Sequence, residues 1–172
     1  MPTGKPNAST GLVTGPVRVL IETQRLCYVA TVSPDGQPNL SPKGSLKVLD
    51  SHHLAFAHIA SPQTLANLEA NPRLEINVVD PFLRRGYRIR GTAEIVHTPQ
   101  LIAVVGEGLG DDFPVQAAVR ITVADVRPVD SPVYLFTDTP AEQVQKTWEA
   151  NYGYQRSRPP SLAANPCCDE EL

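Results

Sequence analysis

Between Leu26 and Arg90, apolar and polar residues alternate in short blocks that are separated by turn residues, a pattern that predicts strands joined by hairpins. Ser33-Pro34-Asp35-Gly36 forms the clearest turn, because proline presets φ and glycine accepts a positive φ. Gly91, inside a long β-rich run, indicates a bulge. The expected strands are Leu26–Val32, Gln37–Leu49, Leu54–His58, Leu74–Val79, Tyr87–His97, Val115–Val126 and Val133–Thr137.

Helical periodicity is confined to short segments. Ser61 suits the N-cap of a helix, and Pro62 suits its first position. Asn71 and the proline after it should end this helix. The other expected helices are Val17–Thr23, for which an edge strand is the alternative, Gln100–Glu107, and a last one from Thr139 to about Tyr152. Six or seven strands with hairpin connections and short helices predict a mainly β, antiparallel barrel, α+β in the broad sense.

This division predicts one domain with extensions at both ends. We expect a flexible arm over 1–14, a barrel domain over 15–138, a helix within 139–155 that packs on the barrel or on a dimer partner, and a disordered tail over 156–172. A length of 172 residues is enough for such a domain to bury its core without disulfides.

Composition and charge narrow the function classes. The net charge of −3 argues against a general nucleic-acid or membrane-surface binder. The chain has three cysteines, and Cys27 lies in an apolar strand, which indicates a reducing environment. The first residues hold no apolar region of the kind that a signal peptide needs. No apolar run approaches the roughly 20 residues of a membrane helix. We therefore expect a cytoplasmic protein with no membrane partner.

The candidate site begins with the second expected strand, Gln37–Leu49. Side-chain alternation would place Ser41, Lys43, Ser45 and Lys47 on one face. Two hydroxyls and two ammonium groups suit an anion such as a phosphate, although a solvated outer face of a sheet is an equally common reading.

Two further features offer groups for an anion. Gln63 and Thr64 lie in the first turn of the Ser61 helix, where free backbone N–H groups attract phosphate. Arginines follow the loop that begins at Pro81, and guanidinium groups bind phosphates and carboxylates. The alternatives are plain helix capping and a solvated rim. The arginines are Arg84, Arg85, Arg88 and Arg90.

Other chemistry finds little support in the sequence. His52, His53 and His58 lack the ligand spacing of a metal site, and no nucleophile lies in a recognisable catalytic motif. We therefore name no catalytic residue and no metal site. An anion site without acid–base machinery is typical of a protein whose cofactor carries the reaction.

The order of motifs resembles the pyridoxamine 5'-phosphate oxidase-like flavin-binding split barrels. The cues are the runs 30–38, 41–44, 68–73 and 87–93, which read ATVSPDGQP, SPKG, LEANPR and YRIRGTA. The resemblance implies a six-stranded antiparallel split β-barrel, a homodimer, and FMN bound at the dimer interface. It also implies that the second strand and the next helix hold the FMN phosphate.

Carried over residue by residue, the resemblance assigns cofactor binding to a set on three elements. Gln63 and Thr64 stand where the oxidase has an Arg-Lys pair, and Gly86 stands where it has a glutamine near the flavin. Lys43 and the arginines near Arg85 could compensate for the missing charges. The implied set is Ser41, Lys43, Ser45, Lys47, Gln63, Thr64, Arg85 and Arg88.

The oxidase's C-terminal substrate motif is not apparent, so the resemblance implies an FMN-dependent oxidoreductase of unassigned small-molecule substrate or electron donor. The alternatives are a non-catalytic carrier or sensor that binds a flavin, the deazaflavin F420 or a haem-like group. A small-barrel nucleic-acid binder is disfavoured, because the chain is acidic and holds few aromatic residues. Lys43→Ala and Lys47→Ala are each predicted to weaken FMN binding by about 1.5–3 kcal/mol.

Overall fold

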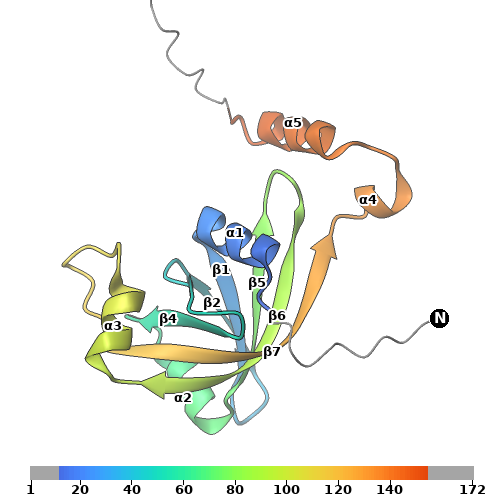
Figure 1. The fold of residues 1–172 in the computed structure, drawn as a ribbon. Coiled ribbons are helices and arrows are strands. Elements are labelled where there is room, and N and C mark those ends of the chain that lie inside the picture. The colour runs from blue at the N-terminus through green and yellow to red at the C-terminus, as the bar shows by residue number, and fades with distance from the viewer. Residues whose placement is uncertain (1–11, 155–172) are drawn as a thin grey trace, which may run out of the picture.

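The computed structural model describes residues 12–154, which form one curled antiparallel sheet with short helices around it (Figure 1). The strands are β1 Cys27–Val32, β2 Pro38–Lys43, β3 Lys47–Val48, β4 His53–His58, β5 Arg73–Asp80, β6 Arg85–Val96 and β7 Ala117–Asp130. The helices are α1 Gly15–Gln24, α2 Pro62–Ala70, α3 Pro99–Gly106, α4 Val133–Phe136 and α5 Ala141–Asn151. The sheet order is β2-β1-β5-β6-β7-β4-β3.

This order makes the sheet a split barrel, since β2 and β3 follow each other in the chain but form opposite edges of the sheet. Residues 44–46 cross the split between those edges. The hydroxyl of Ser45 accepts a hydrogen bond from the backbone N–H of Ala57, at 3.0 Å, and so attaches the crossover to β4. The mainly β, antiparallel fold class is confirmed, with seven strands where the resemblance implied six.

The additional strand comes from a break in the expected strand Gln37–Leu49. β2 pairs with β1 over Pro38–Lys43, whereas β3 pairs with β4 over Lys47–Val48. A continuous strand could not reach both edges of a curled sheet, so the chain bends at Gly44. The prediction of one unbroken strand, with all four polar side chains on one face, is wrong.

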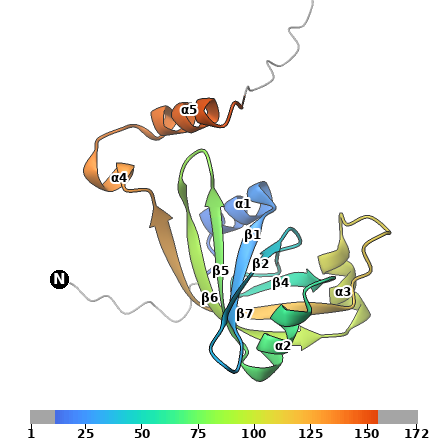
Figure 2. The same ribbon diagram turned by 180° about the vertical axis from the view of Figure 1, so that it is seen from behind.

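The barrel interior holds the main hydrophobic core, and a smaller core lies outside it. Side chains from β1, β4, β5, β6 and β7 fill the interior, and Val17 and Ile21 of α1 belong to the same cluster. On the outer face of β4 and β7, α3 contributes Val105 to a cluster with small alanines. Figure 2 shows α2 at one end of the barrel and α3 beside β4. The alanines are Ala55, Ala57 and Ala118.

Most predicted boundaries hold to within a few residues, and Gly91 marks a bulge as expected. The β6–β7 register shifts between Arg90 and Gly91. A side chain at Gly91 would lie 2.6 Å from both Ile121 Cγ2 and the Thr122 carbonyl oxygen, so the close approach requires glycine. β7 continues beyond the expected end at Val126, to Asp130.

Three local predictions were wrong. Residues 133–136 form the short helix α4 and not a strand. Ser61 precedes α2, but its side chain makes no capping hydrogen bond. Val13, placed in a flexible arm over 1–14, is 6% exposed and belongs to the core, and its backbone N–H donates to the Ser51 carbonyl at 3.0 Å. The rest of that arm, residues 1–11, and the predicted tail from 156 lie outside the described residues.

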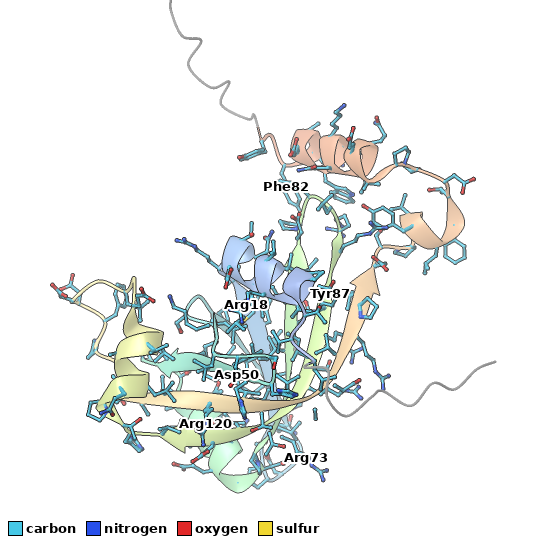
Figure 3. The ribbon with its side chains drawn as sticks, viewed as in Figure 1. Arg18, Asp50, Arg73, Phe82, Tyr87 and Arg120 are labelled. Carbon is cyan, nitrogen blue, oxygen red and sulfur yellow. The ribbon has the colours of Figure 1, made fainter. Side chains whose placement is uncertain are left out.

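The C-terminal helices extend beyond the barrel and meet it at the tip of the β5–β6 hairpin. Phe82, at that tip, lies 6.0 Å from the ring of Tyr152 and 5.0 Å from that of Tyr154 (Figure 3). Arg84 lies over the Trp148 ring at 4.2 Å. No helix within residues 12–154 is long and apolar enough to cross a membrane.

Candidate functional site

The inward face of β2 carries the polar residues on which the site is built. Alternation along the strand places Asn39, Ser41 and Lys43 on the less exposed side, while the residues between them are exposed. In the register with β1, Asn39 lies opposite Thr31, and Lys43 lies opposite Cys27. A polar strand edge therefore faces the inside of the barrel next to the split.

Lys43 is the unusual member of this face. It is only 7% exposed, its ammonium donates to Ser41 Oγ at 2.5 Å, and it lies 5.6 Å from the centre of the Phe56 ring. No carboxylate within residues 12–154 forms an ion pair with it. Because a buried charge without a counter-ion is costly, the position favours an anionic ligand.

Titration properties agree with this geometry. Burial lowers the pKa of Lys43 below its ordinary value of 10.5, and the neighbouring Cys27 acts weakly in the opposite direction. Burial also raises the pKa of Cys27 to about 12, with Lys43 opposing that rise. The thiol is therefore neutral at physiological pH and does not neutralise the ammonium.

The first turn of α2 lies against this face, as the sequence suggested it could. Asn39 Nδ2 donates to Thr64 Oγ1 at 3.1 Å and joins β2 to the helix. Because Ser61 makes no cap, the backbone N–H groups of Gln63 and Thr64 have no hydrogen-bond acceptor within residues 12–154. Ser41 and Lys43 lie on the same face of β2 as Asn39, which bonds the start of α2, and we call Ser41, Lys43, Gln63 and Thr64 the seam site.

Ser45 and Lys47 do not lie on the same face as Lys43. Lys47 pairs in register with Ala55, which packs outside the barrel near α3, and its ammonium lies 3.5 Å from the Glu107 carboxylate. Both residues line a cavity of about 560 Å³ between α1, the crossover and the end of α3, which Arg25 also lines. The ion pair is largely exposed and contributes little stability.

The predicted arginines are engaged elsewhere. Arg85 bonds Asp130 at 3.0 Å and lies 3.6 Å from the Tyr134 ring. Arg88, at 2.6 Å, and Arg90, at 2.7 Å, both bind Glu75. These hydrogen bonds lower the pKa of the Glu75 carboxyl, and the bond from Arg88 has the larger effect. The structure therefore places Ser41 and Lys43 on one face of β2 and joins that face to Thr64 through Asn39, whereas Arg85, Arg88 and Arg90 of β6 pair with carboxylates.

Three residues that lie behind the seam site were missed in the sequence analysis, and one of them left a readable signal. Asn39 continues the alternation of Ser41 and Lys43 by one step towards the hairpin turn, so the polar face could have been extended to it. Thr31 and Asn67 gave no such signal, because each occurs in an otherwise ordinary strand or helix.

His58 is buried at the end of β4, and its Nδ1 lies 3.5 Å from Ser61 Oγ. The described residues contain no cluster of three potential metal ligands.

Comparison with known proteins places this fold in a family. The sequence profile of the family described as pyridoxamine 5'-phosphate oxidase matches residues 13–130. The chain belongs to this family. The match includes every strand of the barrel and the whole seam site, so the split barrel is the family's domain, and the resemblance drawn from the motifs is confirmed.

Solved structures agree with this assignment. HupZ of Group A Streptococcus is 34% identical, with a TM-score of 0.61, and the likeness covers 69% of this chain and 94% of HupZ. An FMN-binding protein from Syntrophomonas wolfei has a TM-score of 0.61 at 15% identity, over 67% of this chain and 84% of that one. An F420 reductase has a TM-score of 0.54 at 24% identity, over 67% and 98%. The last two show a shared fold alone.

Proposed function

We propose that this protein binds FMN, with the flavin phosphate in the seam site, and that it is an FMN-dependent oxidoreductase. The observation that carries the proposal is the buried ammonium of Lys43, which lacks a carboxylate partner within the described residues. Membership of the pyridoxamine 5'-phosphate oxidase family and the fold shared with an FMN-binding protein support it.

The donor set of the seam site fits a phosphate. Lys43 supplies a positive charge, Ser41 supplies a hydroxyl, and the start of α2 supplies N–H groups at the positive end of its dipole. A phosphate dianion would offset the cost of keeping Lys43 charged. Lysine and backbone N–H groups would thereby replace the Arg-Lys pair that the resemblance places at Gln63 and Thr64.

The remaining residues would position the cofactor and limit access to it. When bound, FMN would supply the redox chemistry by exchanging a hydride. Phe56 and the barrel core close one side of the seam, and Ser45 holds the crossover on β4. Lys47 and Arg25, on the cavity between α1 and α3, offer positive charges to an anionic part of a substrate or electron donor. Ser41 and Lys43 form no hydrogen bond or ion pair with a carboxylate within residues 12–154, so we assign no general acid or base to them.

The absorption spectrum of the purified protein tests this proposal. We expect a yellow protein with flavin bands, release of FMN identified by mass after denaturation, and oxidation of NAD(P)H in the presence of an electron acceptor. Bound FMN without turnover would leave the carrier or sensor alternative, and bound deazaflavin would favour F420. A colourless protein that does not bind added FMN would refute the proposal.

A homodimer is part of the same proposal, and an apolar strip on the outer face of β1 and β2 is the surface we assign to it. Leu40 is 64% exposed on this strip, and Tyr28, Val32 and Leu26 are between 43% and 48% exposed. An exposed strip of apolar side chains is typical of a surface that a partner covers.

Leu40→Glu is expected to convert the dimer into a monomer, because it places a charge in the centre of that apolar surface. Sedimentation equilibrium of both proteins at equal concentration measures the change. Val19→Glu, on the outer face of α1, is the matched control and should stay dimeric; Val19 is 61% exposed. A dimer that persists in Leu40→Glu would reject this surface.

A further inference from the structure

A hydrogen-bonded network of uncharged side chains lies behind the seam site and joins β1, β2 and α2. The hydroxyl of Thr31 accepts from Asn39 Nδ2 and from Asn67 Nδ2, both at 3.0 Å. Asn39 Nδ2 also donates to Thr64 Oγ1 at 3.1 Å, and Gln63 Nε2 donates to Asn67 Oδ1 at 2.7 Å. Thr31, Thr64 and Asn67 are 3%, 2% and 0% exposed.

The network determines where the first turn of α2 lies relative to β2. α2 spans nine residues and its N-cap side chain makes no hydrogen bond, so among local features only the proline at its first position favours its start. Its first-turn side chains Gln63 and Thr64 are instead bonded to Asn67 and Asn39. Because a buried amide that loses its partner is costly, this arrangement resists displacement of the turn.

The direction of these bonds also matters for a ligand. A hydroxyl has one hydrogen to donate, and it can accept two further bonds. Thr64 Oγ1 accepts from Asn39, and Ser41 Oγ accepts from Lys43, so each hydroxyl keeps its hydrogen for another acceptor. Together with the ammonium of Lys43 and the N–H groups of Gln63 and Thr64, which have no acceptor in the part of the chain that the structure describes, the seam site presents donors, which suits a fully ionised phosphate.

We propose that Thr31, Asn39 and Asn67 are positioning residues, which hold the first turn of α2 against β2 so that the donors of both elements meet one phosphate group. The proposal rests on the proposed function, since it assumes that the seam site takes the phosphate of FMN. None of the three residues is assigned contact with the flavin, and each acts through Thr64, Gln63 or the backbone of α2.

The test compares the dissociation constants of FMN and of riboflavin, which lacks the phosphate, for the full-length protein. A positioning role predicts that Asn39→Ala lowers FMN affinity about tenfold and leaves riboflavin affinity unchanged. Asn39→Asp should reduce FMN affinity further, because the carboxylate would turn the Thr64 hydrogen towards itself and repel phosphate. Asn71→Ala is the matched control, since Asn71 bonds the Arg73 N–H at the other end of α2.

Thr31 keeps the test decisive if the Asn39 variants do not fold. Thr31→Val removes the central hydroxyl at nearly constant volume and should reduce the FMN preference, whereas Thr31→Ser keeps the hydroxyl and should restore it. A variant whose melting temperature falls while the ratio of FMN to riboflavin affinity stays at the wild-type value would overturn the proposal. Wild-type protein with no FMN binding would instead refute the proposed function itself.

Discussion

Replacing Lys43 with methionine is expected to lower FMN affinity by about 1.5–3 kcal/mol, which corresponds to roughly 10- to 150-fold, since a charged hydrogen bond to the phosphate is lost. The same change should raise the stability of the ligand-free protein, because it removes a buried ammonium that has no carboxylate partner within residues 12–154. A loss of binding together with a gain in stability is typical of a residue kept for its ligand.

The pH dependence of stability provides an independent check on Lys43. Burial lowers its pKa in the folded state below the ordinary 10.5, so the unfolded chain binds more protons between the two values. Stability of the ligand-free wild type should therefore increase with pH as it rises through the lowered pKa towards 10.5. Lys43→Met should lack this increase, which urea unfolding at a series of pH values would measure.

Lys146→Met changes an exposed lysine on α5 and should alter neither FMN affinity nor the pH dependence. If Lys43→Met bound FMN as tightly as the wild type does, the phosphate would have to lie elsewhere. The cavity lined by Lys47 and Arg25 would then be the next site to test, by Lys47→Ala.

Gly86→Ala should be among the most destabilising single substitutions in this chain. An added Cβ would lie 2.1 Å from the Val78 carbonyl oxygen and 2.7 Å from Val79 Cα, both backbone atoms of β5. Strands β5 and β6 would have to separate at their pairing, so we expect a loss of about 3 kcal/mol. Thermal unfolding should show a midpoint lowered by roughly 6–12 °C.

Gly15→Ala is the matched control, since no atom lies within 4 Å of the added Cβ at the start of α1. Its melting temperature should stay close to that of the wild type, and an equal melting temperature for Gly86→Ala would contradict the close packing of the hairpin. The same packing explains a departure from the resemblance. At Gly86, where the oxidase carries a glutamine near the flavin, the backbone of β5 leaves no space for a side chain.

Local patterns predicted the strands and the turns well, because hairpins between neighbouring strands depend on nearby residues. The turn at Ser33–Gly36 and the bulge at Gly91 both followed from single residues with special backbone requirements. The strand predicted over Val133–Thr137 was wrong, because a short run of apolar and aromatic residues fits a strand as well as it fits one helical turn.

The site depended on longer-range geometry, which sequence alternation does not contain. The break at Gly44 arises because the chain must cross from one sheet edge to the other, and it moved Ser45 and Lys47 away from Ser41 and Lys43. The arginines looked free for a ligand until the sheet register placed Glu75 beside Arg88 and Arg90. The burial of Lys43 likewise depends on the curl of the sheet into a split barrel, which brings β2 close to Phe56 of β4.

Titration of the ligand-free protein with FMN, followed by quenching of flavin fluorescence, tests the central claim most directly. We predict saturable binding of one FMN per chain, with a preference for FMN over riboflavin that depends on Lys43 and is at least tenfold weaker in Lys43→Met. Failure of the wild type to bind FMN, or equal affinity for FMN and riboflavin, would contradict a phosphate site at the seam of this barrel.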